Sequence, residues 1–207
     1  NHIEIEKKYT VPDDTVFNRV LDVIKRWDQY EVEDSQPAIK QVDFYFDTKD
    51  NLLFKNDVTL RIREKDSRKI LTIKTPTSES NDRFEYEKEL NEKRLIEHKD
   101  FITRYIPKLS DDDIEKLEKK IKISNNRQEV ILQKEKVEFE MVFDDVKYYR
   151  HDNGKCYNEF QIEVELKSDY PHRINLNKLG NYLEENIEEL KIINDPKYKR
   201  ALRFTQR

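Results

Sequence analysis

Charged and apolar residues alternate along several segments of this 207-residue chain. In the first segment, Glu4 and Glu6 alternate with Ile3 and Ile5. Successive side chains of a strand point to opposite faces of a sheet, so this pattern predicts a β-strand with one charged and one apolar face. Other segments repeat it, with the charged pairs Arg61/Arg63, Glu85/Glu87, Glu138/Glu140 and Glu163/Glu165. A sheet that is charged along one whole face can belong to few folds.

Two arrangements of such a sheet are compatible with the pattern. In the first, the charged face lies in water and helices cover the apolar face, with cross-strand Glu–Arg pairs worth only ~0.2–1 kcal/mol each. In the second, the sheet closes into a barrel with its charged face inward, and about eight strands give an interior wide enough for a small ligand. The second arrangement explains why only 35% of the residues are hydrophobic, because the apolar layer then lies outside, beneath amphipathic helices. Enclosed charges need partners or a ligand of opposite charge.

The periodicity of the chain predicts an α+β domain on a mostly antiparallel sheet. Period-2 patterns predict strands over residues 2–10, 38–48, 57–75, 82–90, 123–133, 136–149 and 156–167, with turns at Asp66-Ser67-Arg68 and Asp152-Asn153-Gly154. Helical spacing predicts a helix from Pro12 to Trp27, one from Leu95 to Ile106, a short one carrying Ile114, Leu117 and Ile121 after a Ser110/Asp113 capping box, one over about 175–190, and a Lys/Arg-rich helix at the end. No linker or internal repeat divides these elements, so residues 1–207 are expected to form a single domain.

Composition excludes several classes of protein. No apolar run approaches the ~18 residues that a bilayer span needs, so no membrane association is expected. The 40 Lys and Arg and 44 Asp and Glu residues give a net charge of −4 with the signs interleaved, which argues against a nucleic-acid partner. The single cysteine, Cys156, excludes a disulfide framework, and the lack of a signal-like N-terminus predicts a cytoplasmic location. A homodimer is left open.

Any bound phosphate must be held by side chains. The chain has only two glycines, Gly154 and Gly180, and therefore lacks a Gly-rich phosphate loop. On the charged faces, the cations Lys8, Arg61, Arg63, Lys74 and Arg127 would form a receptor for a polyanion, since guanidinium groups bind phosphate oxygens in pairs. The carboxylates Glu4, Glu6, Glu163 and Glu165 are hard oxygen ligands, which Mg²⁺ or Mn²⁺ binds together with substrate phosphates. An enclosed face with both sets suits a metal-bound triphosphate.

Short motifs follow one another along nearly the whole chain. They are Glu4-Ile5-Glu6-Lys7-Lys8, Tyr45-Phe46-Asp47-Thr48, Leu60-Arg61-Ile62-Arg63, Leu71-Thr72-Ile73-Lys74, the alternating Arg83, Glu85 and Glu87, Phe143-Asp144-Asp145-Val146, Phe160-Gln161-Ile162-Glu163-Val164-Glu165, and Lys197-Tyr198-Lys199-Arg200-Ala201. In this order, and with Arg127 between them, they resemble the signature elements of the CYTH superfamily, the triphosphate tunnel metalloenzymes. One such motif in so charged a chain would mean little, whereas the ordered set is specific.

The resemblance implies a closed eight-stranded antiparallel barrel with a charged interior, surrounded by helices, and a divalent metal, Mg²⁺ or Mn²⁺. It assigns metal binding to Glu4, Glu6, Glu163, Glu165 and Asp144, and binding of the triphosphate to Lys8, Arg61, Arg63, Lys74, Arg83, Arg127 and Lys197. The expected catalytic residues are Glu4, Glu6, Lys8, Glu85, Glu87 and Asp144. For each acidic pair, the alternative is a cross-strand salt bridge to an arginine of the barrel interior.

The expected reaction is attack on one phosphorus of a metal-held triphosphate. Hydrolysis of inorganic triphosphate needs the fewest additional features and is the favoured function. The alternatives are a thiamine or nucleoside triphosphatase, an adenylate cyclase that converts ATP to cyclic AMP and pyrophosphate, and a polyphosphate-binding module without turnover. The expected partner is thus a small molecule such as tripolyphosphate, ATP or thiamine triphosphate.

Overall fold

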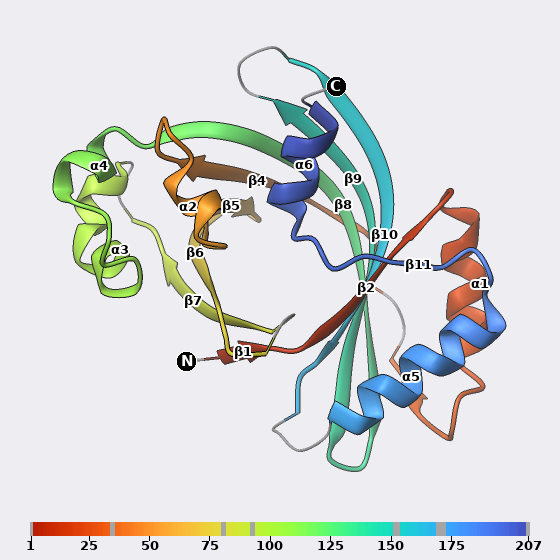
Figure 1. The fold of residues 1–207 in the computed structure, drawn as a ribbon. Helices are drawn as coiled ribbons and strands as arrows, with labels where there is room; N and C mark the ends of the chain where they lie inside the picture. The colour runs from red at the N-terminus through yellow and green to blue at the C-terminus, as the bar shows by residue number, and fades with distance from the viewer. Residues whose placement is uncertain are drawn as a thin grey trace.

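The centre of the protein is one curled sheet, shown in Figure 1. The computed structural model describes residues 2–33, 36–79, 82–91, 94–150, 154–168 and 173–205. Its strands are β1 (His2–Glu4), β2 (Glu6–Val11), β3 (Glu31–Val32), β4 (Ile39–Asp47), β5 (Thr59–Lys65), β6 (Arg68–Pro76), β7 (Arg83–Glu89), β8 (Glu118–Lys134), β9 (Val137–Arg150), β10 (Cys156–Leu166) and β11 (Lys191–Ile192). Its helices are α1 (Thr15–Ile24), α2 (Leu52–Lys55), the 3₁₀ helix η1 (Leu95–His98), α3 (Lys99–Tyr105), α4 (Asp111–Glu115), α5 (Arg173–Asn186) and α6 (Lys197–Thr205). The predicted α+β class is confirmed.

The sheet is antiparallel and open. Its strands follow the order β1-β7-β6-β5-β4-β8-β9-β10-β2-β11, and β3 pairs with β8 beside this path. The ladders between these strands are antiparallel, as the alternating sequence predicts. The path has two ends, and the curled sheet forms a half-barrel. The prediction of a closed eight-stranded barrel is therefore wrong in both closure and strand number.

The first strand explains why the sheet stays open. The predicted strand over residues 2–10 is interrupted at Ile5, and its two halves pair with different neighbours: β1 with β7 over three residue pairs, and β2 with β10 over six. Within the described residues, β7 beyond Glu85 pairs only with β6. A closed barrel requires a continuous ladder around its circumference. Here the chain itself, at Ile5, connects β1 at one end of the path to β2, which is next to the last strand, β11, at the other end.

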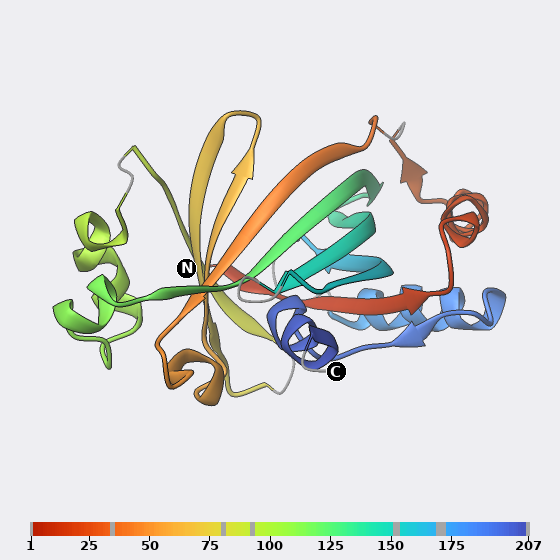
Figure 2. The ribbon, with the colours of Figure 1, turned by 90° about the horizontal axis from the view of Figure 1, so that it is seen from above.

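Helices cover the outer face of the sheet on two sides, as Figure 2 shows. On one side α1 and α5 pack against β2, β8, β9 and β10 around the buried residues Val20, Leu179 and Phe139. On the other side α3 and α4 pack against β4, β5 and β6, around buried residues such as Leu60 and Ile102. These buried residues confirm the predicted apolar layer outside the charged face. Burial of apolar surface is the main favourable term in folding, which explains why helices cover this face.

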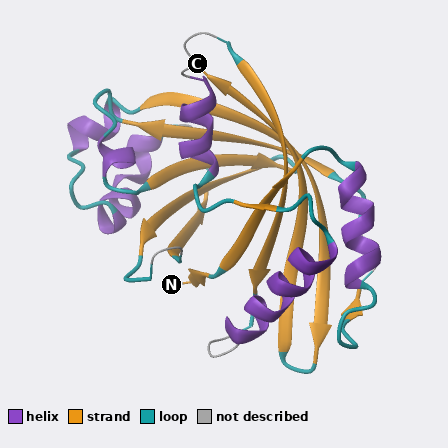
Figure 3. Ribbon diagram, turned by 45° about the vertical axis from the view of Figure 1, so that its right-hand side comes forward, coloured by secondary structure: helices purple, strands orange, loops and turns teal. Residues whose placement is uncertain are grey.

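The last helix does not lie outside with the others. Tyr45 on β4 is two residues from Asp43, and Tyr148 on β9 is four residues from Asp144. Because side chains an even number of residues apart lie on the same face of a strand, both tyrosines share the concave face with these acids. Together with Ile121, Ile123 and Val146 they form a third apolar cluster, against which α6 packs through Tyr198 and Ala201. Figure 3 shows α6 on the concave side of the sheet. The expectation that helices only surround the sheet is corrected at this point.

Several local predictions can be compared with the structure. The turn between β5 and β6 has Asp66 and Ser67 in the left-handed region, with φ of 50° and 63°, as tight hairpins require. The Ser110/Asp113 capping box is confirmed, with Asp113 N donating to Ser110 Oγ at 3.2 Å.

Other local predictions differ from the structure or lie beyond it. Ile121, expected on the short helix, belongs to β8, because α4 ends at Glu115 and packing on the sheet prevails over the helical spacing. The predicted Asp152-Asn153 turn lies outside the described residues. No helix in the described part of the chain has both the length and the apolarity to span a bilayer.

Candidate active site

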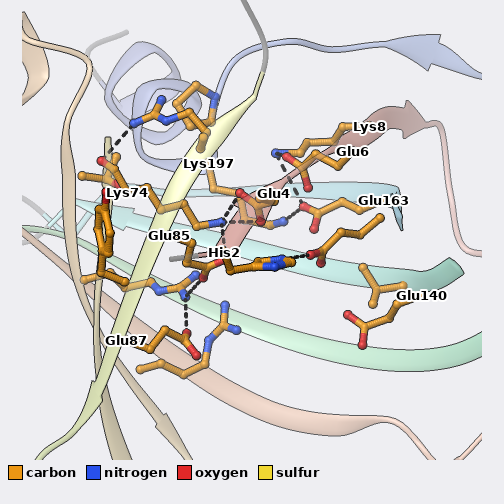
Figure 4. Close-up of a pocket in the computed structure, with 18 of the residues that line it drawn as sticks. His2, Glu4, Glu6, Lys8, Lys74, Glu85, Glu87, Glu140, Glu163 and Lys197 are labelled. Atoms are coloured by element: carbon orange, nitrogen blue, oxygen red, sulfur yellow. Dashed lines mark hydrogen bonds and ion pairs between the residues drawn. The ribbon is translucent and has the colours of Figure 1, made fainter. Parts of the chain in front are cut away.

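The concave face of the sheet holds a cavity of about 580 Å³. Its wall is mainly charged, and Figure 4 shows side chains from β1, β2, β6, β7, β9, β10 and α6 converging on it. The predicted site residues on this wall are Glu4, Glu6, Lys8, Arg61, Arg63, Lys74, Arg83, Glu85, Glu87, Arg127, Glu163, Glu165 and Lys197. Of the predicted set, only Asp144 lies behind the wall rather than on it. The alternation in the sequence thus identified one continuous surface.

The N-terminal strand brings two acids and one lysine to the cavity. Lys8 Nζ lies 2.8 Å from Glu6 Oε1 and 3.9 Å from Glu163 Oε1 on the neighbouring β10, its direct partner in the ladder. Glu4, on the other half of the strand, is held by Lys74 of β6, whose Nζ lies 2.5 and 2.6 Å from its two carboxylate oxygens. Each acid of the first motif is therefore paired with a lysine of the cavity.

The two arginines of β5 have different surroundings. Arg63 donates to both oxygens of Asp43 on β4, at 2.8 and 2.9 Å. Arg61 donates to the hydroxyl of Thr72 at 3.0 Å, but its nearest carboxylates, those of Asp43, Glu85 and Glu87, lie 3.7 to 4.0 Å away. The Nε of Arg61 is buried without a hydrogen-bond partner. Of the two arginines of β5, Arg61 thus has more unused capacity for an anion.

A second cluster joins β8, β9, β10 and α6. Arg127 donates to both oxygens of Asp144, at 2.8 and 2.6 Å, and lies 3.2 Å from Glu163. Lys197, the first residue of α6, contacts Glu163 directly and lies 3.2 Å from Asp144. Asp144 is 0% exposed. It orients Arg127 from behind and has no surface on the cavity, and the metal-binding and catalytic roles expected for it stay a prediction.

The carboxylates differ in how firmly they hold their charge. Burial would raise the pKa of Glu163, but the three cations around it outweigh burial and hold this pKa well below its ordinary range. The same balance, with Arg127 and Lys197 as the cations, lowers the pKa of Asp144. In contrast, burial raises the pKa of Glu6 despite the nearby Lys8, and burial also raises the pKa of Glu165. Glu6 and Glu165 therefore accept a proton, or a cation in its place, more readily than Glu163 does.

Burial and charge act on the lysines in the opposite sense. Burial alone would lower the pKa of Lys74, but Glu4 and Glu85 outweigh it and the pKa is raised. The pKa of Lys8 is raised in the same way, against burial, by Glu6 and Glu163. Both lysines are consequently charged at neutral pH and available to an anion.

Two residues of the recognised motifs support the backbone. Arg83 donates to the backbone oxygen of Asp57 and, at 3.2 Å, to that of Lys74. Asp47 is 0% exposed and accepts from the backbone N–H groups of Leu53 and Phe54, at 2.9 and 3.0 Å, which fixes the start of α2. The hydroxyl of Tyr198 also donates to Asp47 at 3.2 Å, so this acid ties α6 to β4.

Some residues on the cavity wall or directly behind it were not selected from the sequence. Asp43 belongs to the alternating series Gln41, Asp43, Tyr45 and Asp47, so the period-2 signal was present, but a single acid between apolar residues did not stand out. Lys167 is the last residue of the predicted strand over residues 156–167, and it pairs with Glu165 at 2.8 Å. His2 lies 3.1 Å from Glu165, and no local pattern in the sequence marks it as part of a site.

The donor chemistry of the cavity fits a hard divalent cation. Glu4, Glu6, Glu163 and Glu165 supply carboxylate oxygens, the ligands that Mg²⁺ and Mn²⁺ prefer. Among the described residues, however, no three acidic, histidine or cysteine side chains are grouped closely enough to form a ready cation site. Each of these glutamates is paired with a lysine, an arginine or a histidine instead. A metal would therefore have to replace these partners.

Solved structures share this fold at low sequence identity. A candidate adenylate cyclase from Bacillus halodurans aligns with a TM-score of 0.68 and 20% identity over 96% of this chain and 97% of its own. The PH1819 protein of Pyrococcus horikoshii OT3 aligns with a TM-score of 0.60 and 20% identity over 99% of both chains. HpAC1 of Hippeastrum, a candidate adenylyl cyclase with a dominant triphosphatase activity, aligns with a TM-score of 0.61 and 17% identity over 96% of this chain and 95% of its own.

The sequence itself decides the family. No curated protein sequence matches this chain. The CYTH domain, in contrast, matches residues 2–197, which include the predicted site residues. This chain therefore belongs to the CYTH family.

Proposed function

We propose that this protein is a divalent-metal-dependent triphosphatase, with inorganic triphosphate as its simplest substrate. The observation that carries the proposal is the mixed wall of one cavity of about 580 Å³. Lysines and arginines on this wall lie next to carboxylates. A site for a polyanion alone would need the cations but not the acids. A site for a metal-bound triphosphate uses both sets, because the acids hold the metal and the cations hold phosphate oxygens. Membership of the CYTH family supports the same class of substrate.

The ion pairs of the cavity suggest how the substrate enters. Without ligand, Lys8 neutralises Glu6 at 2.8 Å and Lys74 neutralises Glu4 at 2.5 Å. A triphosphate offers the lysines stronger anionic partners, and its metal offers the glutamates a stronger cationic partner. We infer that binding exchanges these partners, with Mg²⁺ or Mn²⁺ held by Glu4, Glu6, Glu163 and Glu165. Arg61 can engage a phosphate oxygen without losing a close carboxylate, since its nearest acid lies 3.7 Å away.

The reaction assigned to this site is attack of water on the terminal phosphorus. The bond from that phosphorus to the bridging oxygen breaks, and orthophosphate and pyrophosphate leave. The bound metal supplies charge neutralisation and alignment of the phosphates. Arg61, Arg127 and Lys197 stabilise the negative charge on the phosphate oxygens. Glu85 lies 3.9 Å from both Arg61 and Lys74 and, among the residues that the structure describes, is in no closer ion pair, so we assign it to accept the proton that water loses.

The decisive experiment measures products and metal dependence together. Purified protein is incubated with tripolyphosphate, ATP or thiamine triphosphate, with Mg²⁺, Mn²⁺ or EDTA, and orthophosphate, pyrophosphate and cyclic AMP are quantified separately. We expect equimolar orthophosphate and pyrophosphate from tripolyphosphate, and none in EDTA. Cyclic AMP with pyrophosphate as the main products from ATP would replace the proposal by a cyclase. Binding of tripolyphosphate without any product would replace it by a polyphosphate-binding module.

A matched pair of variants assigns the chemistry to the cavity. Glu6→Gln removes the acid of the Glu6–Lys8 pair. Glu118→Gln removes the exposed acid of the Glu118–Lys120 pair, which has the same spacing along a strand and a similar distance of 2.7 Å. Loss of a metal ligand removes several kcal/mol of transition-state stabilisation, so we expect Glu6→Gln to lower turnover about 100-fold or more. Glu118→Gln should stay within twofold of wild type. Equal activity of the two variants would refute the assignment of Glu6.

A further inference from the structure

The cavity does not end at its charged wall. Three aromatic residues, Tyr86 on β7 and Phe101 and Tyr105 on α3, line the same cavity as the predicted phosphate-binding residues. All three side chains pack against the outer apolar cluster beneath α3, but they are only half-buried and so remain partly accessible. The oxygens of a triphosphate bind to cations and hydrogen-bond donors, and aromatic carbon atoms offer neither. This part of the cavity must be explained by something other than phosphate binding.

The open side of the sheet gives the cavity access to these rings. Tyr86 alternates with Glu85 and Glu87, so it points away from the charged face. In the described part of the chain, β1 covers the edge of β7 only as far as Glu85, and from Tyr86 onward that edge has no neighbouring strand. Residues of β7 and of α3 line the same cavity, and α3 lies beside β7 in Figure 1. Because the sheet is open at this edge, the charged part of the cavity is continuous with the part lined by Tyr86, Phe101 and Tyr105.

The rings form a compact, ordered wall. Tyr86 and Tyr105 are stacked, with ring centroids 3.8 Å apart and an interplanar angle of 15°. Phe101 meets Tyr105 edge to face at 5.1 Å, and Lys88 lies over Phe101 at 5.9 Å. Rings fixed by one another lose little entropy when a further flat ring packs on them, and a base on an aromatic side chain gains about 1–3 kcal/mol.

Distances connect this wall with the phosphate-binding cluster. Glu87 follows Tyr86 in the chain, its side chain is 51% exposed, and its carboxylate lies 4.0 Å from Arg61 and accepts from the hydroxyl of Thr72 at 3.1 Å. Arg61 is one of the two arginines that we assign to phosphate. A molecule held by Arg61 at its phosphates therefore has the aromatic wall within reach of its other end. The total volume of about 580 Å³ also lies within the range of sites for organic ligands.

We propose that Tyr86, Phe101 and Tyr105 form a subsite for a flat aromatic ring carried by the triphosphate, and that they determine preference for organic over inorganic substrates. The inference rests on the proposed triphosphate site and adds to it the residues that recognise the rest of the molecule. Adenosine and thiamine triphosphates both carry such a ring, and the experiment below separates them.

The test compares ligands with and without a ring. Calorimetric titrations in Ca²⁺, used to limit turnover, measure the Kd of tripolyphosphate and of adenosine 5′-(β,γ-imido)triphosphate for wild type, Tyr105→Leu and Tyr105→Phe. We expect Tyr105→Leu to weaken the adenosine ligand about tenfold, as loss of one stacking partner predicts, and to change tripolyphosphate less than twofold. Tyr105→Phe retains the ring and should bind both ligands as wild type does. A parallel measurement of KM for thiamine triphosphate and ATP shows which ring depends more on Tyr105.

Two further variants keep the test decisive. Tyr149→Leu is the matched control, because Tyr149 is a half-buried aromatic residue with a lysine over its ring at 5.5 Å, yet it does not line the cavity. It should leave both affinities unchanged. Phe101→Leu replaces Tyr105→Leu if the latter does not fold, as judged by its melting curve. Equal weakening of both ligands, or no effect on the adenosine ligand, overturns the subsite. If wild type hydrolyses no triphosphate but Tyr105→Leu still weakens only the adenosine ligand, the proposed function is refuted and the subsite stands.

Discussion

Replacing Asp43 with asparagine tests whether the two arginines of β5 have different purposes. Asp43 is 1% exposed and accepts from Arg63 at 2.8 and 2.9 Å, while Arg61 lies 3.7 Å away. Burial would raise the pKa of Asp43, but Arg63 and Arg61 outweigh burial, and the pKa falls from 3.8 to about 2. Folding therefore stabilises the ionised carboxylate, and Arg63 is engaged in this pair in the absence of a ligand.

The lowered pKa sets the sign and size of the effect. At about 1.4 kcal/mol per pH unit, a pKa of about 2 in the folded state and 3.8 in the unfolded chain corresponds to about 2 kcal/mol of unfolding free energy at pH 7. Because the folded state has the lower pKa, this stabilisation is present above pH 3.8 and is lost as the pH falls toward 2, with about half gone at pH 3. Asp43→Asn should therefore be about 2 kcal/mol less stable than wild type at pH 7, and the difference should shrink below pH 4.

Urea unfolding of wild type and Asp43→Asn at pH 7, 5, 4 and 3 measures this difference directly. Asp112→Asn is the control, because Asp112 is paired with Lys116 at 2.6 Å but its side chain is 70% exposed, so its loss should cost less than about 1 kcal/mol at any pH. A difference for Asp43→Asn that stays constant from pH 7 to 3 would refute the reasoning. So would a cost at pH 7 no larger than that of the control.

Three further outcomes are expected. Arg61→Ala should raise the Kd of tripolyphosphate about 10- to 100-fold, as loss of a charge-assisted hydrogen bond predicts, whereas Lys119→Ala, at an exposed lysine over Phe44, should change it less than twofold in the same titration. Saturating tripolyphosphate in Ca²⁺ should raise the melting midpoint by several degrees, and sulfate at matched ionic strength should not; equal stabilisation by both would mean that the cavity has no specificity for linear phosphates. Glu159→Gln should destabilise the protein by about 3 kcal/mol in urea, because it leaves the half-buried Arg200 of α6 without its bidentate partner at 2.6 and 2.9 Å; a loss below about 1 kcal/mol would mean that the apolar contacts of α6 suffice.

The composition of the charged wall could be predicted from the sequence. The period-2 alternation is a local property of the pleated strand, so Glu4, Glu6 and Lys8 had to share one face wherever the strand was placed. The same reasoning placed Arg61 and Arg63 together, and Glu163 with Glu165. The order of the motifs then identified the family, and with it the lysines and arginines of distant strands that meet in one cavity.

The pairing of these charges could not be predicted from the sequence. Arg61 and Arg63 have the same local pattern, but register places Arg63 directly opposite Asp43 and leaves Arg61 opposite Tyr45. Asp144 looked like a metal ligand in its motif, whereas its position behind Arg127 is fixed by the ladder between β8 and β9. Such partners are separated by many residues in the chain, so no local periodicity contains them.

Tertiary structure also decided the shape of the cavity. The sequence of residues 2–10 reads as one strand, and only pairing with β7 on one side and β10 on the other shows that it is divided at Ile5 and leaves the sheet open. The amphipathic pattern of α6 does not say which apolar surface it covers, and the structure places it on the concave face, with Lys197 in the cavity. A local pattern specifies which face of an element is buried. Only the curvature of the sheet and its long-range contacts specify what buries it.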